Sequence, residues 1–352
     1  MGARTRRGEV GVVDLARELG ISTATVSRAL NGSSAVRPEL AQRVREHAEA
    51  RGYVANRLAR ALSANTSRAF VGFVIPYVDT PAYSAVAAEC ARLLSRDGTQ
   101  MILTITENDP ELEHRQLREL LASRVAGLIV SPSTHILDAS KQLLTSVPVV
   151  QLHRSCGIEA PGVFSDDEQA MAECVLHLAA LGHRHIAYLG TPVALSNGAV
   201  RLRGVRRGIE LAGLNEDDVT MSLVEPTQQN GHQATLDLLR EKPTALMIGG
   251  GSLSVGAAHA VRERGLRLPD DLSLVAYGDP SWFALSEPPL TTVAVSYQAL
   301  AETAAELLLA RLDERHRSPA TTHLIPPQLR LAGSTGPRNP GEHNGVPGGN
   351  AC

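Results

Sequence analysis

The most informative stretch of the chain runs from Val12 to Leu30 and reads VVDLARELGISTATVSRAL. Gly20 stands four positions after Ala16, and Val26 stands ten positions after Ala16. A small residue lets two helices approach closely, a glycine makes the tight turn between them, and a valine fills the core that they share. This spacing predicts a helix-turn-helix.

Capping signals set the limits of the helices in this head. We expect helices over residues 12–19 and 23–30, and a third between Pro38 and Arg51. Gly20 can adopt the left-handed conformation that ends a helix, and Ser22 is a good N-cap for the second helix. The sequence therefore predicts an all-α head of three short helices.

The second predicted helix carries short polar side chains and Arg28 on the face away from Val26. Short side chains allow a helix to lie deep in the major groove, and an arginine can donate two hydrogen bonds to a guanine. This face therefore predicts contact with DNA. An amphipathic surface helix with incidental serines and threonines is the alternative.

Charge is distributed unevenly along the chain. Residues 1–67 contain eleven arginines and six carboxylates, whereas the whole chain contains 34 basic and 37 acidic residues. The head therefore carries a net charge of +5, and the remainder carries −8. A basic head on an acidic body favours a polyanion-binding module, although a solvated charged face would give the same count.

After residue 68, short apolar runs alternate with longer helical stretches, which is the pattern of β-α-β units. Several runs are almost wholly apolar, as expected for parallel strands that are covered on both faces. We expect strands over residues 70–75, 100–104, 127–130, 147–152, 185–189, 245–248, 272–276 and 291–294. We expect helices that include residues 82–95, 111–123, 167–181, 200–212, 231–240 and 253–264. The pattern predicts an α/β body of two doubly wound, parallel-sheet lobes, with chain crossings near residues 162–165 and at Ser296.

The sequence contains no signal for secretion, a membrane span, a metal centre or a catalytic motif. No apolar run reaches the roughly 18 residues needed to span a bilayer. The four cysteines, Cys90, Cys156, Cys174 and Cys352, form no CxxC pair. No GxGxxG follows the first strand and no GxSxG occurs, and His183 and His185 are spaced as a strand edge. We therefore expect a cytoplasmic protein that is not an enzyme, with no membrane partner, metal or cofactor.

Longer motifs resemble the lactose-repressor (LacI/GalR) family of transcriptional regulators. In the head these are Asp14-Leu15-Ala16 and Gly20-Ile21-Ser22-Thr23-Ala24-Thr25-Val26-Ser27-Arg28-Ala29-Leu30-Asn31-Gly32. The resemblance continues through residues 51–62, 181–190, 288–293 and 333–335, and covers residues 10 to about 337. It implies lobes of the periplasmic-binding-protein-like type and a regulator, in most such cases a repressor, that a small-molecule effector controls.

The resemblance also implies which head residues bind operator DNA. Thr23, Ala24 and Arg28 are expected to face bases. The residues expected on phosphates are Ser22, Thr25, Ser27, Asn31 and Tyr53. Hydroxyls and amides at helix ends suit phosphate oxygens. Gly11 departs from the family, which usually has a threonine N-cap there, but glycine is a tolerable cap.

Residues 56–63 resemble the family's hinge helix. Asn56, Ala59 and Leu62 are expected to contact DNA there, with Leu62 inserted into the minor groove. The alternative is that Leu58 and Leu62 pack on the body. We expect four segments: a helix-turn-helix domain (1–54), a hinge helix and linker (55–67), a two-lobed effector-binding and dimerisation body (68–337), and a disordered tail (338–352).

The resemblance places an effector between the lobes, at the carboxyl ends of the strands. Tyr83 matches an aromatic lining position, and Arg201 matches a ligand-clamping arginine. The positions that depart from groups that usually bind the ligand are His153, Pro226, Gly250 and Gly278. Asp279 remains. The expected partner is a sugar or an acidic metabolite, and the lost sugar-binding groups favour the acidic one, held by Arg201 with a protonated His153 as a second donor.

Three alternatives stay open. A salt bridge between Arg201 and Asp279 could latch the lobes without any effector, and the glycine run 249–251 could admit a phosphate. A two-lobed small-molecule-binding protein without operator function is the rival from another class. For the regulator we expect a homodimer on double-stranded operator DNA, because one head offers few contacts and two-fold symmetry doubles them.

Overall fold

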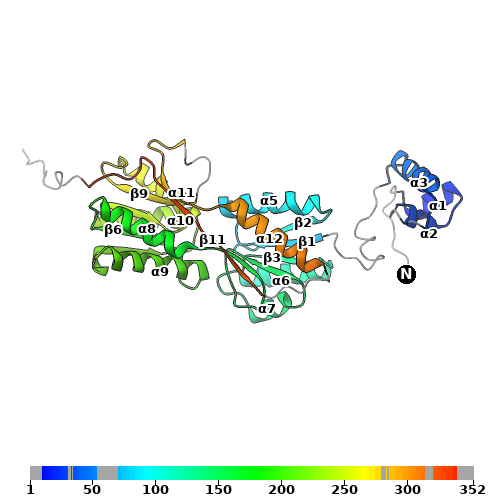
Figure 1. Cartoon of the computed structure of the whole chain (residues 1–352), viewed down its shortest axis with the longest axis horizontal. Helices are drawn as coiled ribbons and strands as arrows, with labels where there is room; N and C mark the ends of the chain where they lie inside the picture. Colours follow the sequence, from blue (N-terminus) through cyan, green and yellow to red (C-terminus); the bar gives the residue numbers. More distant parts are fainter. Residues whose placement is uncertain are drawn as a thin grey trace, which may run out of the picture. The chain divides into compact units, whose positions relative to one another are not determined.

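The structure is a computed structural model that describes residues 10–30, 33, 35–53, 70–278, 283, 285–313 and 320–338. The chain divides into two compact units, residues 1–66 and 67–352, and each is described by itself (Figure 1). The predicted hinge and linker, and the predicted tail beyond Arg338, lie outside the described residues.

The head consists of the three predicted helices: α1 (Val12–Leu19), α2 (Thr23–Leu30) and α3 (Pro38–Ala50). Leu15, Val26 and Val44, one from each helix, are fully buried together. Gly20 ends α1 with a φ of 68°, in the left-handed conformation that favours glycine. The helix-turn-helix prediction is confirmed.

The first lobe of the body is built on a parallel sheet of six strands in the order β11-β5-β4-β3-β1-β2. Its strands are β1 (Phe70–Ile75), β2 (Gln100–Ile105), β3 (Leu128–Val130), β4 (Val149–Leu152), β5 (Gly162–Ser165) and β11 (Thr322–Ile325). Helices α5 (Pro81–Arg96) and α12 (Tyr297–Leu312) cover one face, and α6 (Pro110–Ala122) and α7 (Asp138–Leu144) cover the other. Both faces of the sheet are apolar because successive side chains of a strand point to opposite faces: in β1, Phe73 packs on the side of α5 and α12, and Val74 packs on the side of α6 and α7.

The second lobe repeats this plan with the strand order β12-β10-β9-β8-β6-β7. Its strands are β6 (Ile186–Gly190), β7 (Val219–Leu223), β8 (Ala245–Ile248), β9 (Ser273–Tyr277), β10 (Thr291–Ala294) and β12 (Gln328–Arg330). Its helices are α8 (Asp167–Ala180), α9 (Ser196–Leu211), α10 (Gln228–Leu238) and α11 (Gly251–Glu263), with short 3-10 turns η1 (Glu216–Asp218) and η2 (Leu239–Glu241). Edge strand β12 runs antiparallel to β10, and the other pairs are parallel.

The chain crosses between the lobes three times. Strand β5 leads to α8, β10 leads to α12, and β11 leads to β12. The first crossing follows Ser165 and the second passes through Ser296, as predicted. The third was not predicted, because β11 and β12 are half-exposed edge strands without an apolar run.

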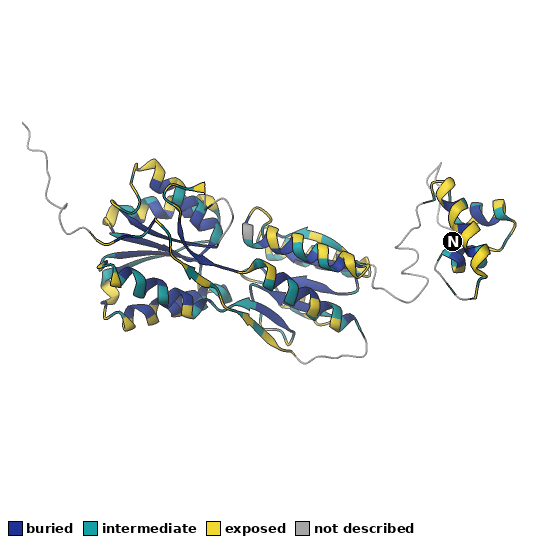
Figure 2. Cartoon of the chain, turned by 45° about the horizontal axis from the view of Figure 1, so that its top comes forward, coloured by how far each residue is buried: buried dark blue, intermediate teal, exposed yellow. Residues whose placement is uncertain are grey.

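Burial follows the layers: the inner strands of each sheet are largely buried, the edge strands are partly exposed, and the helices are buried on their inner faces (Figure 2). Helices α8 and α9 approach closely because α9 carries Gly204 and Gly208 where it meets α8. A Cβ atom on Gly204 would overlap the backbone oxygen of Glu168 and stand 2.8 Å from Cβ of Met171. The absence of a side chain at Gly204 therefore sets the spacing of the two helices.

We predict that Gly204→Ala lowers the free energy of unfolding. Alanine gains about 1 kcal/mol over glycine inside a helix, but overpacking costs about 1–3 kcal/mol and acts here on a rigid backbone. Thermal unfolding of the full chain measures the net effect. Arg207→Ala, on the exposed side of α9, is the matched control and should change stability by less than about 0.5 kcal/mol. A Gly204→Ala protein as stable as the wild type would contradict this packing.

Candidate functional site

Helix α2 presents a polar face away from the head's core. Thr23, Ala24 and Arg28 are exposed, whereas Val26 and Ala29 on the other side are buried. Arg28 forms no ion pair with a described residue of the head. This face can therefore present a guanidinium and short side chains to a groove wide enough for a helix, such as the major groove of DNA.

The N-terminus of α2 is held by its predicted cap. Ser22 Oγ accepts a hydrogen bond from the Thr25 backbone N–H at 3.1 Å and lies 2.8 Å from Thr25 Oγ1. Thr25 and Ser27 are half-buried, and Tyr53 packs against the core of the head. Asn31, Asn56, Ala59 and Leu62 lie outside the described residues.

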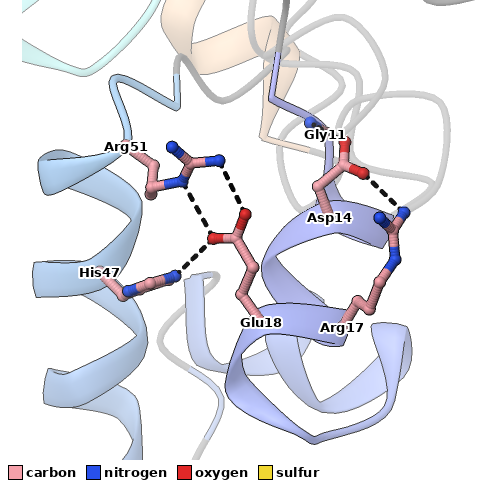
Figure 3. A network of polar contacts seen from close by, with 6 residues as sticks. All are labelled: Gly11, Asp14, Arg17, Glu18, His47 and Arg51. Carbon is pink, nitrogen blue, oxygen red and sulfur yellow. Dashed lines mark hydrogen bonds and ion pairs between the residues drawn. The ribbon is translucent and has the colours of Figure 1, made fainter.

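A carboxylate ties α1 to the end of α3 (Figure 3). Glu18 accepts hydrogen bonds from Arg51 at 2.7 and 3.0 Å and lies 2.8 Å from His47 Nε2. The hydrogen bond from Arg51, followed by that from His47, lowers the pKa of Glu18. At the other end of α1, the Gly11 N–H donates to the Asp14 side chain at 3.0 Å, which is the half of a capping box that needs no side chain at the N-cap. Both contacts fix the scaffold that carries α2.

The body holds a cavity of about 60 Å³ between its lobes. Its walls come from the carboxyl ends of strands in both sheets, where such folds bind ligands. Tyr83, His153 and Arg201 all line it, so three of the four predicted effector residues come together. The fourth, Asp279, is outside the described part of the chain. Pro226 and Gly250 also line the cavity.

Arg201 is satisfied by the protein itself. Its Nε donates to Asp167 at 2.6 Å, Nη1 to the Gly249 carbonyl oxygen at 2.9 Å and Nη2 to the Tyr277 hydroxyl at 2.7 Å. Asp167 is fully buried. Burial lowers the pKa of Arg201, but Asp167 and Tyr277 raise it by more, so Arg201 stays charged. The partner of Arg201 is therefore Asp167, which the sequence did not reveal.

His153 is neutral near neutral pH. Burial, followed by the charge of Arg201, lowers the pKa of His153 to about 4, although a hydrogen bond with the Ala82 backbone opposes the shift. His153 would therefore need a pH well below neutral to act as a second donor. The Nε2 atom of His153 has no hydrogen-bond partner among the described residues. The ring packs edge-on against Tyr83, with 5.2 Å between the two ring centroids. A neutral ring whose other nitrogen donates to a carbonyl offers Nε2 as an acceptor.

Four buried polar atoms on this cavity have no partner within the described residues: His153 Nε2, Arg154 Nε, Thr191 Oγ1 and Asn197 Oδ1. Buried polar atoms are normally hydrogen-bonded, so a cluster of unpaired ones marks a place where water or a ligand supplies the missing hydrogen bonds. Arg154, Thr191 and Asn197 were not predicted. A signal existed for two of them, since Thr191 directly follows β6 and Arg154 comes two residues after β4.

One glycine of the run 249–251 has a packing explanation. A Cβ atom on Gly249 would overlap the Tyr188 hydroxyl, whereas one on Gly250 would stand 3.2 Å from the Leu253 side chain and one on Gly251 would lie 3.9 Å from the Tyr277 carbonyl oxygen. Space therefore requires glycine at Gly249. Among the described residues no group of three potential metal ligands occurs, and no helix is long and apolar enough to cross a bilayer.

Comparisons with known proteins agree with both parts. The model of bacterial regulatory proteins of the lacI family matches residues 12–56, and a periplasmic binding protein-like domain matches residues 175–335. Catabolite control protein A of Priestia megaterium is 30% identical, over 85% of this chain and 91% of its own. The transcriptional regulator MalR of Streptomyces coelicolor is 30% identical, over 92% of this chain and 96% of its own. The crystal structure of the lac repressor dimer bound to operator and the anti-inducer ONPF matches with a TM-score of 0.81 and 26% identity, covering 93% of this chain and 99% of that one.

A helix-turn-helix head joined to a two-lobed binding body defines a ligand-responsive transcriptional regulator. The chain belongs to the lacI family of bacterial regulatory proteins. It is a DNA-binding transcriptional regulator with an effector-binding body, and the rival without operator function is not favoured.

The low pKa of His153 predicts a pH-dependent stability. The folded value of about 4 lies below the ordinary 6.5, so between these values the unfolded chain binds a proton that the folded chain does not. Stability is therefore lost as pH falls from 6.5 towards 4, by about 1–3 kcal/mol. Thermal unfolding of wild type and His153→Gln at pH 7 and pH 4.5 tests this, and the wild type should lose more stability.

The exposed His135→Gln should keep the wild-type profile. Burial also lowers the pKa values of His177 and His183, which contribute equally to all three proteins. Parallel profiles for wild type and His153→Gln would show that His153 titrates normally.

Proposed function

We propose that the protein is a repressor-type regulator that binds operator DNA as a homodimer through α2. The observation that carries this is the exposed face of α2, on which Arg28 has no ion pair with a described residue. Thr23 and Ala24 beside it are short enough to let the helix enter a major groove. Ser22, Thr25, Ser27, Asn31 and Tyr53 position the helix on phosphates, and Asn56, Ala59 and Leu62 bind DNA from the hinge.

The homodimer follows from the size of the head. One exposed helix face reads only a few base pairs, and a two-fold pair of heads reads two half-sites. The lac repressor that resembles this chain was solved as a dimer on its operator. We propose the division into head (1–54), hinge and linker (55–67), body (68–337) and tail (338–352), and an action in the cytoplasm without catalysis.

The body controls DNA binding by holding a small-molecule effector between its lobes. The ligand class is a sugar or an acidic metabolite. Hydrogen bonds already span the cleft: Glu225 of the second lobe accepts from Tyr77 at 3.1 Å and from Asn108 at 2.9 Å. A ligand that touches both lobes changes the balance of such contacts, and any difference in its affinity for two arrangements shifts the population between them.

Arg28→Ala tests the reading face. Loss of a guanidinium that binds a guanine should cost about 1–3 kcal/mol of operator affinity and relax the preference at one base pair. The measurement is fluorescence anisotropy of an operator selected by the wild type, in competition with its single-base variants.

Arg45→Ala is the matched control, because Arg45 is an exposed arginine on α3. It removes the same charge and should change the affinity for all variants equally, if at all. Uniform weakening by Arg28→Ala as well would mean that Arg28 touches only phosphate.

A further inference from the structure

Arg154 is a buried guanidinium that forms no ion pair with a described carboxylate. It follows β4, and its side chain is only 3% exposed. A buried cation that lacks an anionic partner is costly for a folded protein. We infer that Arg154 recognises an anionic group of the effector, an inference that rests on the proposed effector site and names its ligand class.

The neighbours of Arg154 leave part of it unused. Its Nη1 donates to Asn108 Oδ1 at 2.8 Å and to the Pro132 carbonyl oxygen at 3.3 Å. Its Nε has no partner, and Nη2 makes no hydrogen bond with a described residue. Nε and Nη2 are the edge with which an arginine binds two oxygens of a carboxylate or phosphate.

A second cavity, of about 400 Å³, adjoins the first and shares Arg154 and Leu195 with it. Its described lining contains two permanent cations, Arg154 and Lys141, and no carboxylate. Four hydroxyls of described residues line this cavity. Those of Ser133 and Ser155 already donate to Glu113 and Gln151, whereas those of Thr134 and Ser196 accept hydrogen bonds and can still donate to a ligand. Cations and hydroxyl donors together are the chemistry that binds an oxyanion.

The nearby carboxylates are engaged elsewhere. Glu113 Oε2 accepts from the Ser133 backbone N–H at 2.7 Å and from its hydroxyl at 2.6 Å. Burial raises the pKa of Glu113, and the hydrogen bonds from Ser133 and the charge of Arg154 oppose that shift, so Glu113 acts on Arg154 through space but forms no ion pair with it. Glu225 is bound by Tyr77 and Asn108, and the Asn108 amide stands between it and Arg154. Lys141 pairs at 3.0 Å only with the exposed Asp138, where water screens the interaction.

Arg201 lines the first cavity too, but Asp167 neutralises it. An anionic ligand is therefore drawn towards Arg154 and away from Arg201. Its uncharged part would occupy the first cavity, where His153 Nε2 accepts a hydrogen bond and Thr191 offers a hydroxyl. The ligand class is a small metabolite that carries a phosphate or carboxylate at one end and a hydroxyl or N–H group in its body.

Calorimetric titration of the full chain, without DNA, tests this with inorganic phosphate and with succinate, each compared with chloride at equal ionic strength. The wild type should bind at least one of the two, with a Kd on the order of 1 mM, or −4 kcal/mol. Phosphate alone would identify a phosphorylated effector, and succinate alone would identify a carboxylate.

Arg154→Gln should weaken anion binding at least tenfold. The affinity of Arg154→Lys should lie between those of the wild type and Arg154→Gln, because lysine keeps the charge but cannot donate two parallel hydrogen bonds to one anion. Arg203→Gln is the matched control, since Arg203 is exposed on α9 and lines neither of these two cavities, and it should bind as the wild type does. Lys141→Gln, at a partly exposed position, should weaken binding severalfold and serves if Arg154→Gln does not fold.

Two results would overturn the assignment: no binding of either anion to the folded wild type, or equal binding by Arg154→Gln. Operator binding by the wild type is measured separately, so failure here with intact operator binding would reject the anion site and leave the regulator in place.

Discussion

The buried ion pair between Arg201 and Asp167 is the constraint around which the cleft side of the second lobe is assembled. Asp167 begins α8 just after the chain first crosses between the lobes, and Arg201 lies on α9. The same guanidinium binds the carbonyl of Gly249 after β8 and the hydroxyl of Tyr277 at the end of β9. Breaking a buried pair by removing one partner costs about 3–5 kcal/mol, so these four segments are held in one arrangement.

This pair also decides the chemistry of the cleft. Because the charge of Arg201 is used inside the protein, the cation left without an ion pair among the described cleft residues is Arg154. Arg154 is linked through Asn108 to Glu225 of the opposite lobe, and Ser155 beside it donates to Ser196 at 2.8 Å. A ligand on Arg154 therefore acts where the two lobes already touch. That position suits a site whose occupancy changes how the lobes pack.

Much of the fold could be predicted because apolar runs and caps are local properties. Strands β1, β8 and β10 begin and end where predicted, and Gly20 and Ser22 bound the turn between α1 and α2. Strands β7 and β11 escaped prediction because they lie at sheet edges and are largely half-exposed, so their sequences lack an apolar run.

The candidate site was predictable only in outline. Matching motifs brought Tyr83, His153 and Arg201 to one cavity. Their charge states could not be predicted, because the partner of Arg201 and the burial of His153 depend on how distant elements pack. Arg154 was missed for the same reason, since its burial and its lack of an ion pair among the described residues appear only when the elements around it are in place.

We propose that this chain reads DNA as a symmetric pair of heads, and selection of duplexes from a random-sequence library by the purified full chain tests this. We expect the enriched duplexes to share an inverted repeat of two half-sites, centred about one helical turn, or a multiple of it, apart. Enrichment of no sequence, or of a single unrepeated half-site, would contradict it.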